Sequence, residues 1–348
     1  MKARQTVLCL FVGILSSVTF AQEQGEGRSP EPHDPLWPSV HDPVMARDGD
    51  TYYVFGTGRG ISTLYSKDLK TWQQGAPVFS EVPAWTQEAL PGFSGKIWAP
   101  DIIYYHGAYH LFYACNRTPG KPDAAIGHAS NPTLDTDSPD FKWTDHGKVV
   151  QSVMGRDLWQ AIDPNIIVDE EGTPWMTFGS FWDGIKLVML TDDLMGLTWP
   201  QEWHSIARRP SDQQLYEYAL YDSQIEAAFI YRKGDYYYLF VSFDMCCHGI
   251  DSDYKIAVGR SESITGPYLD RMGHSMLTGG GTVIAIGDGK QWAALGHNSV
   301  YNIDGKDYLF AHGYSIPDEG KSKLIVTELE WDKHGWPIVT LPMPEKAE

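Results

Sequence analysis

Short runs of apolar and aromatic residues alternate with polar turns along most of the 348-residue chain. The runs have the length of β-strands, are rich in aromatic and β-branched residues, and are bounded by Gly, Asn, Asp and Pro. Examples are Thr51–Phe55, Tyr109–Ala114 and Tyr236–Phe243. Their nearly continuous apolar character predicts sheets that are buried on both faces.

One pattern, a Gly followed by an aromatic strand, occurs five times, at Gly49, Gly107, Gly172, Gly234 and Gly305. The intervals are 58, 65, 62 and 71 residues. A second strand with a polar turn follows each copy, beginning at Ile61, Ala124, Ile185, Tyr254 and Lys323. Two further strands per repeat would complete a four-stranded blade, and repeats of this length are typical of propellers. The sequence therefore predicts an all-β fold, a five-bladed β-propeller. A solenoid is the alternative, but it would not bring five repeats to one point.

A short polar motif precedes each of these glycines by six to nine residues. Aligning the motifs matches five residues, Asp42, Asp101, Asp163, Glu226 and His297. Equivalent positions of a closed ring meet at its axis. We therefore expect three or four carboxylates and one imidazole to converge on the central axis, where the active site would lie.

The N-terminal segment has the features of an export signal. Lys2 and Arg4 precede an apolar run over residues 7–15, and Thr19-Phe20-Ala21 resembles a cleavage site. We interpret residues 1–21 as a signal peptide, 22–34 as a flexible lead-in and 35–348 as the propeller domain. A membrane anchor is the alternative, but the apolar run is short for a bilayer. A secreted protein, extracellular or periplasmic, is expected.

The chain is acidic, with 27 Lys and Arg against 45 Asp and Glu and a formal net charge of −18. Such a surface repels nucleic acid and anionic lipid and suits a neutral substrate. Aromatic residues, 13% of the chain, cover sugar faces but also fill sheet cores. No coiled-coil heptad or docking tail is evident, so we expect a monomer without nucleic acid or membrane partners.

Three cysteines follow the signal region: Cys115, Cys246 and Cys247. Their number and spacing do not indicate a disulfide framework or a zinc site. The adjacent Cys246 and Cys247 are poorly placed to bond each other. We therefore expect buried, unbonded thiols.

Asp42, Asp163 and Glu226 together fit the hydrolysis of a glycosidic bond. That reaction needs a protonated carboxyl at the leaving oxygen and an ionised carboxylate on the other side of the sugar. A third carboxylate nearby raises the pKa of the acid. The alternative is structural, because Asp-Pro often begins a turn. Glu226, in the apolar segment IEAAFIY, is harder to explain in this way.

Long motifs in the chain resemble the arabinanases of glycoside hydrolase family 43. They are HDPVMARDGDTYYVFGTG, IWAPDI, AIDPNIIVDEEGTPWMTFGSFWDGIKL, EAAFIYRKGDYYYLFVSFDMCCHG, YKIAVGRSESITGPY and GGGTVIAIGD with GHNSVY. The resemblance extends from about Asp34 to Tyr314. It implies a five-bladed propeller that cleaves internal α-1,5-linked L-arabinofuranosidic bonds of arabinan with inversion.

The resemblance also implies roles for the acids. Asp42 matches the general base, Glu226 the general acid, and Asp163 the residue that tunes and orients the acid. An ionised Asp163 is expected to keep Glu226 protonated near neutral pH. An inverting mechanism requires the carboxyls of Asp42 and Glu226 to lie roughly 6.5–9.5 Å apart.

Further site residues follow from the resemblance. His297 matches a histidine beneath the active site that holds a hydrated calcium ion, although calcium prefers oxygen ligands; a hydrogen-bonded core histidine is the alternative. Trp98 resembles an aromatic platform, and Asp101 is expected to be structural. The expected sugar contacts are Asn116, Gln160, Ala161, Ile162, Ser180, Phe181 and Trp182. The segment Cys115–Asp123 departs from the family pattern. The resemblance therefore does not fix the detail of the sugar subsites or the preferred length of the substrate.

Arabinan and arabino-oligosaccharides are thus the expected partners. An exo-acting arabinanase, or a related β-xylosidase or α-L-arabinofuranosidase, is an alternative that the loops would decide. A non-catalytic sugar-binding propeller is a second alternative, which would not need all three acids.

Overall fold

The computed structural model describes residues 34–119, 121–210 and 223–342, all within one compact unit, His33–Glu348. Most of this unit consists of five antiparallel sheets. The first blade contains β1 (Val44–Asp48), β2 (Thr51–Gly56), β4 (Ser62–Ser66) and β5 (Gln73–Gln74). The second contains β6 (Lys96–Tyr105), β7 (Ala108–Asn116), β8 (Ala124–Asn131) and β9 (Thr144–Ser152), with β3 (Gly58–Arg59) added at its inner edge.

The last three blades follow in chain order. The third contains β10 (Asn165–Val168), β11 (Pro174–Phe178), β12 (Ile185–Met189) and β13 (His204–Ala207). The fourth contains β14 (Ile225–Lys233), β15 (Tyr236–Phe243), β16 (Lys255–Ser261) and β17 (Thr282–Ala285). The fifth contains β18 (Trp292–Ile303), β19 (Lys306–Ser315), β20 (Lys321–Trp331) and β21 (Pro337–Val339).

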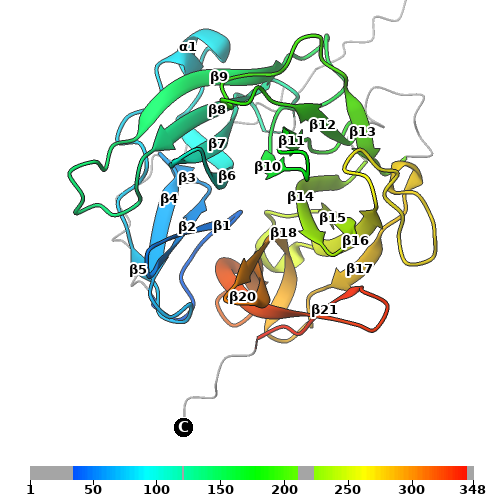
Figure 1. Ribbon diagram of the computed structural model, residues 1–348. Helices are drawn as coiled ribbons and strands as arrows, with labels where there is room; N and C mark the ends of the chain where they lie inside the picture. The colour runs from blue at the N-terminus through cyan, green and yellow to red at the C-terminus, as the bar shows by residue number, and fades with distance from the viewer. Residues whose placement is uncertain (1–33, 120, 211–222, 343–348) are drawn as a thin grey trace, which may run out of the picture. The chain divides into compact units, whose positions relative to one another are not determined.

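The first strands of the five blades form the inner wall of a closed ring (Figure 1). β1 contacts β6, β6 contacts β10, β10 contacts β14, β14 contacts β18, and β18 returns to β1. Near the start of the described chain, Ser39 bridges to Lys323 of β20 and the Leu324 N–H donates to the Pro38 carbonyl at 2.9 Å. The predicted five-bladed β-propeller is confirmed.

Hydrophobic cores lie between neighbouring blades. Five clusters of buried side chains each draw their main members from two adjacent sheets. Phe55 of the first blade and Leu111 of the second share one cluster, for example, and Val54 of the first and Phe310 of the fifth share another. Because both faces of each sheet are covered in this way, the strands read as continuous apolar runs.

The repeated glycines occupy the turns between the first and second strands of the blades. Gly49 has φ 59° and Gly107 has φ 86°, and the other three are also left-handed. An added Cβ would meet no atom within 4 Å at these two positions, so conformation rather than space requires glycine. The aromatic strands that follow are the second strands, and the second repeated element supplies the third.

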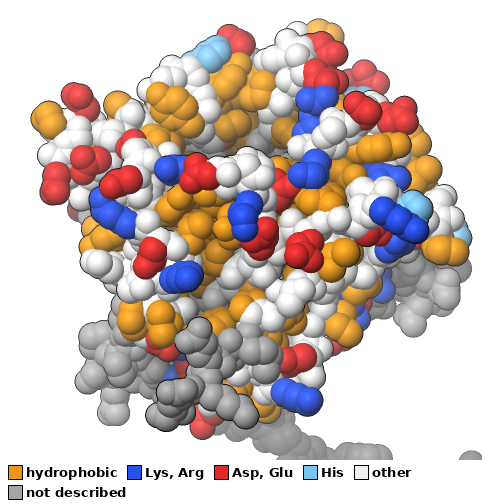
Figure 2. All heavy atoms as spheres, turned by 60° about the horizontal axis from the view of Figure 1, so that its bottom comes forward, with side chains coloured by type: hydrophobic (Ala, Val, Ile, Leu, Met, Phe, Trp, Pro, Cys, Tyr) orange, Lys and Arg blue, Asp and Glu red, His pale blue; other side chains and the backbone are white. Residues whose placement is uncertain are grey.

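Regular helices are short in the described residues. They are α1 (Trp85–Ala89), η1 (Gly249–Asp251) and η2 (Met276–Thr278), and none is long and apolar enough to cross a membrane. The expected signal peptide, and nearly all of the lead-in, lie outside the described residues. On the face seen in Figure 2, acidic and basic side chains lie close together with apolar ones between them.

Candidate active site

A left-handed residue occurs at an equivalent point on the inner wall of each blade. These residues are Asp42 (φ 56°), Ala99 (φ 28°), Asp163 (φ 56°), Ala227 (φ 56°) and His297 (φ 50°). In β6, β14 and β18 the residue lies at a break in strand register. Such a conformation costs a non-glycine residue about 1–3 kcal/mol and persists only where its surroundings hold it.

Hydrogen bonds between blades hold four of these residues. In each case the backbone N–H donates to a side chain of the preceding blade. The pairs are Asp42 with His312 Nδ1 (3.1 Å), Ala99 with Thr57 Oγ1 (2.8 Å), Ala227 with Asp163 Oδ2 (3.1 Å) and His297 with Ser242 Oγ (2.8 Å). The strained backbone is therefore built into the contacts that close the ring.

This geometry corrects the alignment of the five motifs. The left-handed equivalents of Asp42 are Ala99 and Ala227, so Asp101 lies two residues beyond the common position and Glu226 one residue before it. Asp101 bonds the start of the third blade and not the other acids. Its Oδ2 accepts the Ile166 N–H at 2.6 Å and Asn165 Nδ2 at 3.2 Å, which joins the second and third blades. The structural role expected for Asp101 is confirmed.

Asp42 is buried among imidazoles. Its Oδ1 lies 2.8 Å from His41 Nδ1 and 2.9 Å from His297 Nδ1, and its Oδ2 accepts the Thr57 hydroxyl. Burial by itself would raise the pKa of Asp42, but the charges of His41 and His297 outweigh it and hold that pKa well below its usual value. Asp42 is therefore ionised at neutral pH.

His297 brings the three acids together. Burial would lower the pKa of this imidazole, but Asp42 and Asp163 outweigh burial, Glu226 acts in the same direction, and the pKa rises to about 9. Each carboxylate must lie close enough to act on this one ring. Asp163 Oδ2 also accepts the N–H of Ala227, the residue after Glu226, so the three acids lie close together although they come from three different blades.

Glu226 is oriented on both sides by hydroxyl groups. Ser180 Oγ donates to Oε2 at 2.7 Å, and Tyr254 OH donates to Oε1 at 2.7 Å. Burial, with the charge of Glu226 as the next cause, raises the pKa of Tyr254 well above its ordinary value. Tyr254 therefore stays protonated and keeps its donor.

The pKa of Asp163 bears on the role expected for it. Burial raises the pKa of Asp163 to about 8; the charge of His297 opposes this rise, and the carboxylates of Glu226 and Asp42 add to it. The pKa rises because Asp163 has lost its water and lies close to two other acids. A raised pKa favours a proton on Asp163 in the ligand-free site, whereas the ionised Asp163 expected from the sequence stays a prediction.

Three comparisons with known proteins identify the family, and the first is a family profile. The profile of glycosyl hydrolases family 43 matches residues 35–337, which is most of the chain. The chain belongs to glycosyl hydrolases family 43. It is therefore a glycoside hydrolase.

Named relatives of this family 43 enzyme agree. It is 49% identical over 300 residues to the extracellular exo-alpha-(1->5)-L-arabinofuranosidase ArbA of Cellvibrio japonicus, with 86% of each chain covered. It is 40% identical to the extracellular endo-alpha-(1->5)-L-arabinanase 1 of Bacillus subtilis, covering 86% of this chain and 87% of the relative. The structure of Cellvibrio cellulosa alpha-L-arabinanase complexed with arabinohexaose matches with a TM-score of 0.84 and 48% identity, covering 87% of this chain and 96% of the other.

The expected sugar contacts of the family 43 enzyme lie near the acids to different degrees. Ser180 bonds Glu226 directly. Phe181 (φ 50°) and Trp182 (φ 45°) form the left-handed turn that follows, and the Phe181 N–H donates to the Ile225 carbonyl beside Glu226 at 2.7 Å. Ala161 and Ile162 are buried just before Asp163.

The other three expected contacts lie near the second blade. Trp98 is half-buried and packs against a small buried cluster that contains Ile162. Asn116 Nδ2 and Gln160 Nε2 both donate to the Lys121 carbonyl, at 3.2 and 2.8 Å. Asn116 and Gln160 therefore fasten the atypical Cys115–Asp123 segment. Contact of these three side chains with sugar stays a prediction.

The family 43 enzyme offers few protein ligands for calcium at His297. In the described residues, the groups of three donors that could hold an ion are His41 with Cys246 and Cys247, and His41 with Asp42 and His312; His297 belongs to neither. Its Nδ1 faces Asp42, so only Nε2 is available. A calcium ion here would be held mainly by water, and it would compete with the proton on His297.

The cysteines correct another expectation. Cys246 and Cys247 are joined by a disulfide, whereas Cys115 is free and buried. Cys247 takes a left-handed φ of 72°, which turns the chain so that the adjacent sulfurs meet.

Sequence reasoning missed five residues that hold the acids: His41, Thr57, Tyr254, His312 and Tyr314. One signal was present for Thr57. A hydroxyl residue stands eight positions after the turn glycine in three repeats, as Thr57, Ser180 and Ser242. Thr57 donates to Asp42, Ser180 donates to Glu226, and Ser242 accepts the His297 N–H.

Proposed function

We propose that this protein hydrolyses α-1,5-L-arabinofuranosidic bonds of arabinan with inversion of the anomeric centre. The observation that carries the proposal is the closeness of the three acids: Asp42 lies 2.9 Å from His297, and Asp163 accepts the N–H of Ala227, the residue after Glu226. The substrate is supported by the arabinan-related names of the relatives and by the arabinohexaose bound in one similar structure.

Asp42 acts as the general base in this proposal. A base must be ionised, and the imidazoles of His41 and His297 keep the pKa of Asp42 low despite its burial. Thr57 and His41 hold its two oxygens, so the carboxylate meets the attacking water in one orientation. The water gives its proton to Asp42 as its oxygen bonds the anomeric carbon.

Glu226 acts as the general acid and protonates the departing sugar oxygen. The site keeps the proton needed for this step, because Asp163 beside Glu226 has a pKa of about 8. We infer that the Asp163 proton moves to Glu226 when substrate displaces water from the site. Asp163 then becomes the ionised partner that orients the acid.

For the mode of attack, the relatives favour release from a chain end over the internal cleavage expected from sequence. The exo-acting relative and an exo-1,5-alpha-L-arabinanase structure from a bovine ruminal metagenomic library are 49% and 47% identical to this chain. The endo-acting relative and a Bacillus licheniformis endo-arabinanase structure are 40% and 39% identical.

Time-resolved product analysis on linear debranched arabinan tests the mode. A single short product from the first minutes supports exo action, and a ladder of oligomers establishes endo action. NMR of the first product should show the inverted anomer. If the protein released xylose or single arabinose from synthetic aryl glycosides but did not cleave arabinan, it would be assigned as a β-xylosidase or arabinofuranosidase and not as an arabinanase.

Glu226→Gln tests catalysis against simple binding. We expect kcat to fall by about 10²–10⁴-fold while arabino-oligosaccharide binding persists. Glu328→Gln, on the exposed side of β20, is the matched control and should keep wild-type turnover. Equal turnover in both variants would support the non-catalytic sugar-binding alternative.

We also propose that the protein is exported and acts as a monomer. Two named relatives are extracellular, and the N-terminal residues have the features of a signal peptide. Edman sequencing of the secreted protein should begin near residue 22, and light scattering should give the mass of one chain.

A further inference from the structure

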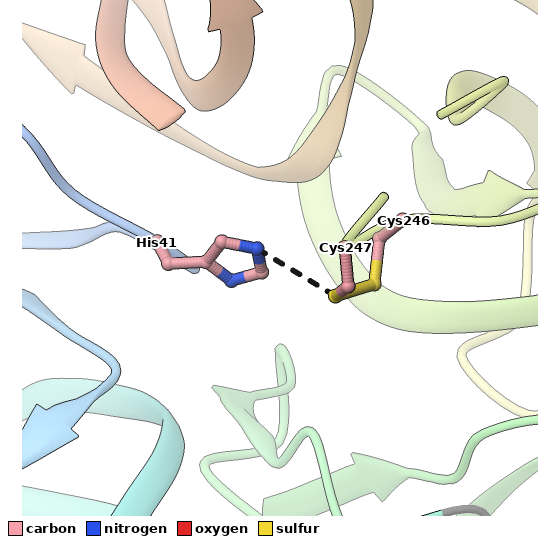
Figure 3. Close-up of side chains that lie close together, drawn as sticks. All are labelled: His41, Cys246 and Cys247. Atoms are coloured by element: carbon pink, nitrogen blue, oxygen red, sulfur yellow. Dashed lines mark hydrogen bonds between the residues drawn. A yellow bond between two sulfur atoms is a disulfide. The ribbon is translucent and has the colours of Figure 1, made fainter. Parts of the chain in front are cut away.

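The Cys246–Cys247 disulfide lies directly against the histidine that pairs with the base. Cys247 Sγ is 3.8 Å from His41 Nε2, and Figure 3 shows the imidazole facing the disulfide. The two cysteines follow β15 of the fourth blade, whereas His41 precedes β1 of the first. The contact therefore reaches across the ring to the residue beside Asp42.

Two hydrogen bonds and one ion pair connect Cys247 to Asp42. The Cys247 N–H donates to Tyr314 OH at 2.7 Å, and Tyr314 OH lies 2.9 Å from His41 Nε2. His41 Nδ1 on the other side of the ring lies 2.8 Å from Asp42 Oδ1. These contacts link the Cys247 backbone to Asp42 through Tyr314 and His41.

Cys246 contacts the support of the acid. Its side chain packs against a buried cluster that contains Tyr254, Ala294 and Tyr314. Tyr254 is the hydroxyl donor to Glu226 Oε1, at 2.7 Å. One covalent unit therefore bonds Tyr314 and packs against the cluster that contains Tyr254, the tyrosine that orients Glu226.

The loop around the cysteines is anchored at its two ends. The Met245 N–H donates to Asp253 Oδ1 at 2.7 Å, and the Asp253 N–H donates to the Met245 carbonyl at 3.1 Å. Between these anchors the left-handed Cys247 aims its N–H at Tyr314. A disulfide between neighbours limits the conformations of this turn, whereas two free thiols would let Cys247 rotate its N–H away.

We propose that the Cys246–Cys247 disulfide is a positioning element of the active site, which sets the orientation of Asp42 through Tyr314 and His41 and that of Glu226 through Tyr254. The proposal rests on the catalytic roles given to these acids under the proposed function. It concerns the geometry of the chemical step, so it predicts an effect on kcat with little effect on KM.

The test is reduction of the folded protein with dithiothreitol. Two electrons and two protons pass to the cysteines, dithiothreitol leaves as its cyclic disulfide, and two additional thiols should titrate. We expect kcat on linear arabinan to fall about tenfold, with KM unchanged, and to recover on reoxidation. The Cys246→Ala/Cys247→Ala variant should have the low kcat and should not respond to dithiothreitol.

A double-mutant cycle separates positioning from general destabilisation. In a Tyr254→Phe/Tyr314→Phe background the hydroxyls that transmit the effect are absent, so reduction should change kcat by less than about twofold. Circular dichroism at the assay temperature confirms that each form is folded. Wild-type kcat in the reduced protein, or an equal loss in the phenylalanine background, overturns the proposal. Absence of arabinan hydrolysis by the oxidised protein would instead contradict the proposed function.

Discussion

His297 Nδ1 lies 2.9 Å from Oδ1 of Asp42, and this pair joins the fifth blade to the first at the centre of the ring. The His297 backbone is left-handed, and its N–H is held by Ser242 of the fourth blade. Because the pair is buried and charged, it fixes where the negative charge of the site lies. Asp42 carries this negative charge because its pKa is lowered, whereas the pKa of Asp163 is raised and favours its protonated form.

The first prediction concerns the base. Asp42→Asn removes the ionised oxygen but keeps the size of the side chain, so kcat on arabinan should fall by about 10²–10⁴-fold with the fold intact. The control is Asp50→Asn, at an exposed ion pair with Lys67, which should turn over like the wild type. A loss of less than about tenfold in Asp42→Asn would assign the base to another residue.

Thr57 is predicted to serve both catalysis and the ring. Its hydroxyl donates to Asp42 and accepts the Ala99 N–H at 2.8 Å. Thr57→Val should lower the free energy of unfolding by about 1–3 kcal/mol, because a backbone N–H loses its acceptor. It should also reduce kcat. Thr57→Ser keeps the hydroxyl and is the matched control in urea unfolding and rate measurements.

Asp101 should leave a signature in the pH dependence of stability. Burial raises its pKa to about 7, although the N–H of Ile166 opposes this. The folded state therefore binds a proton that the unfolded state has lost above pH 4, so the contribution of Asp101 to stability falls as pH rises through 7. The limiting slope is about 1.4 kcal/mol per pH unit.

Asp101→Asn abolishes this titration and keeps an oxygen for Ile166. The unfolding free energy of the variant minus that of the wild type should therefore be larger at pH 8 than at pH 5. Urea unfolding at a series of pH values measures the difference. Parallel stability curves for the two proteins would show that Asp101 does not titrate in this range.

Calcium at His297 stays a prediction with its own test. Activity should fall after chelation and return with calcium but less with magnesium, because magnesium demands a stricter geometry. Isothermal titration of the chelated protein with calcium should give one site, and His297→Gln should weaken it. Full activity and no binding heat in the metal-free protein would leave His297 as the buried partner of Asp42.

The local sequence determined much of this protein. The turn glycines, such as Gly49, require left-handed backbone, and the aromatic strands after them pack on both faces, so repeat, blade and ring follow from local chemistry. Asp42, Asp163 and Glu226 could also be found, because acids in repeated motifs converge when the ring closes.

The tertiary structure decided which side chains face the centre and in what state. Register breaks at Ala99 and Ala227 shift the alternation of strand faces. As a result Asp101 bonds the neighbouring blade. Glu226 lies one residue before the left-handed position with which the sequence alignment had matched it. The raised pKa of Asp163 depends on its burial, and the contacts from Cys247 to Asp42 depend on distances of a few ångströms between blades. Residues remote in the chain set those distances, and no local pattern encodes them.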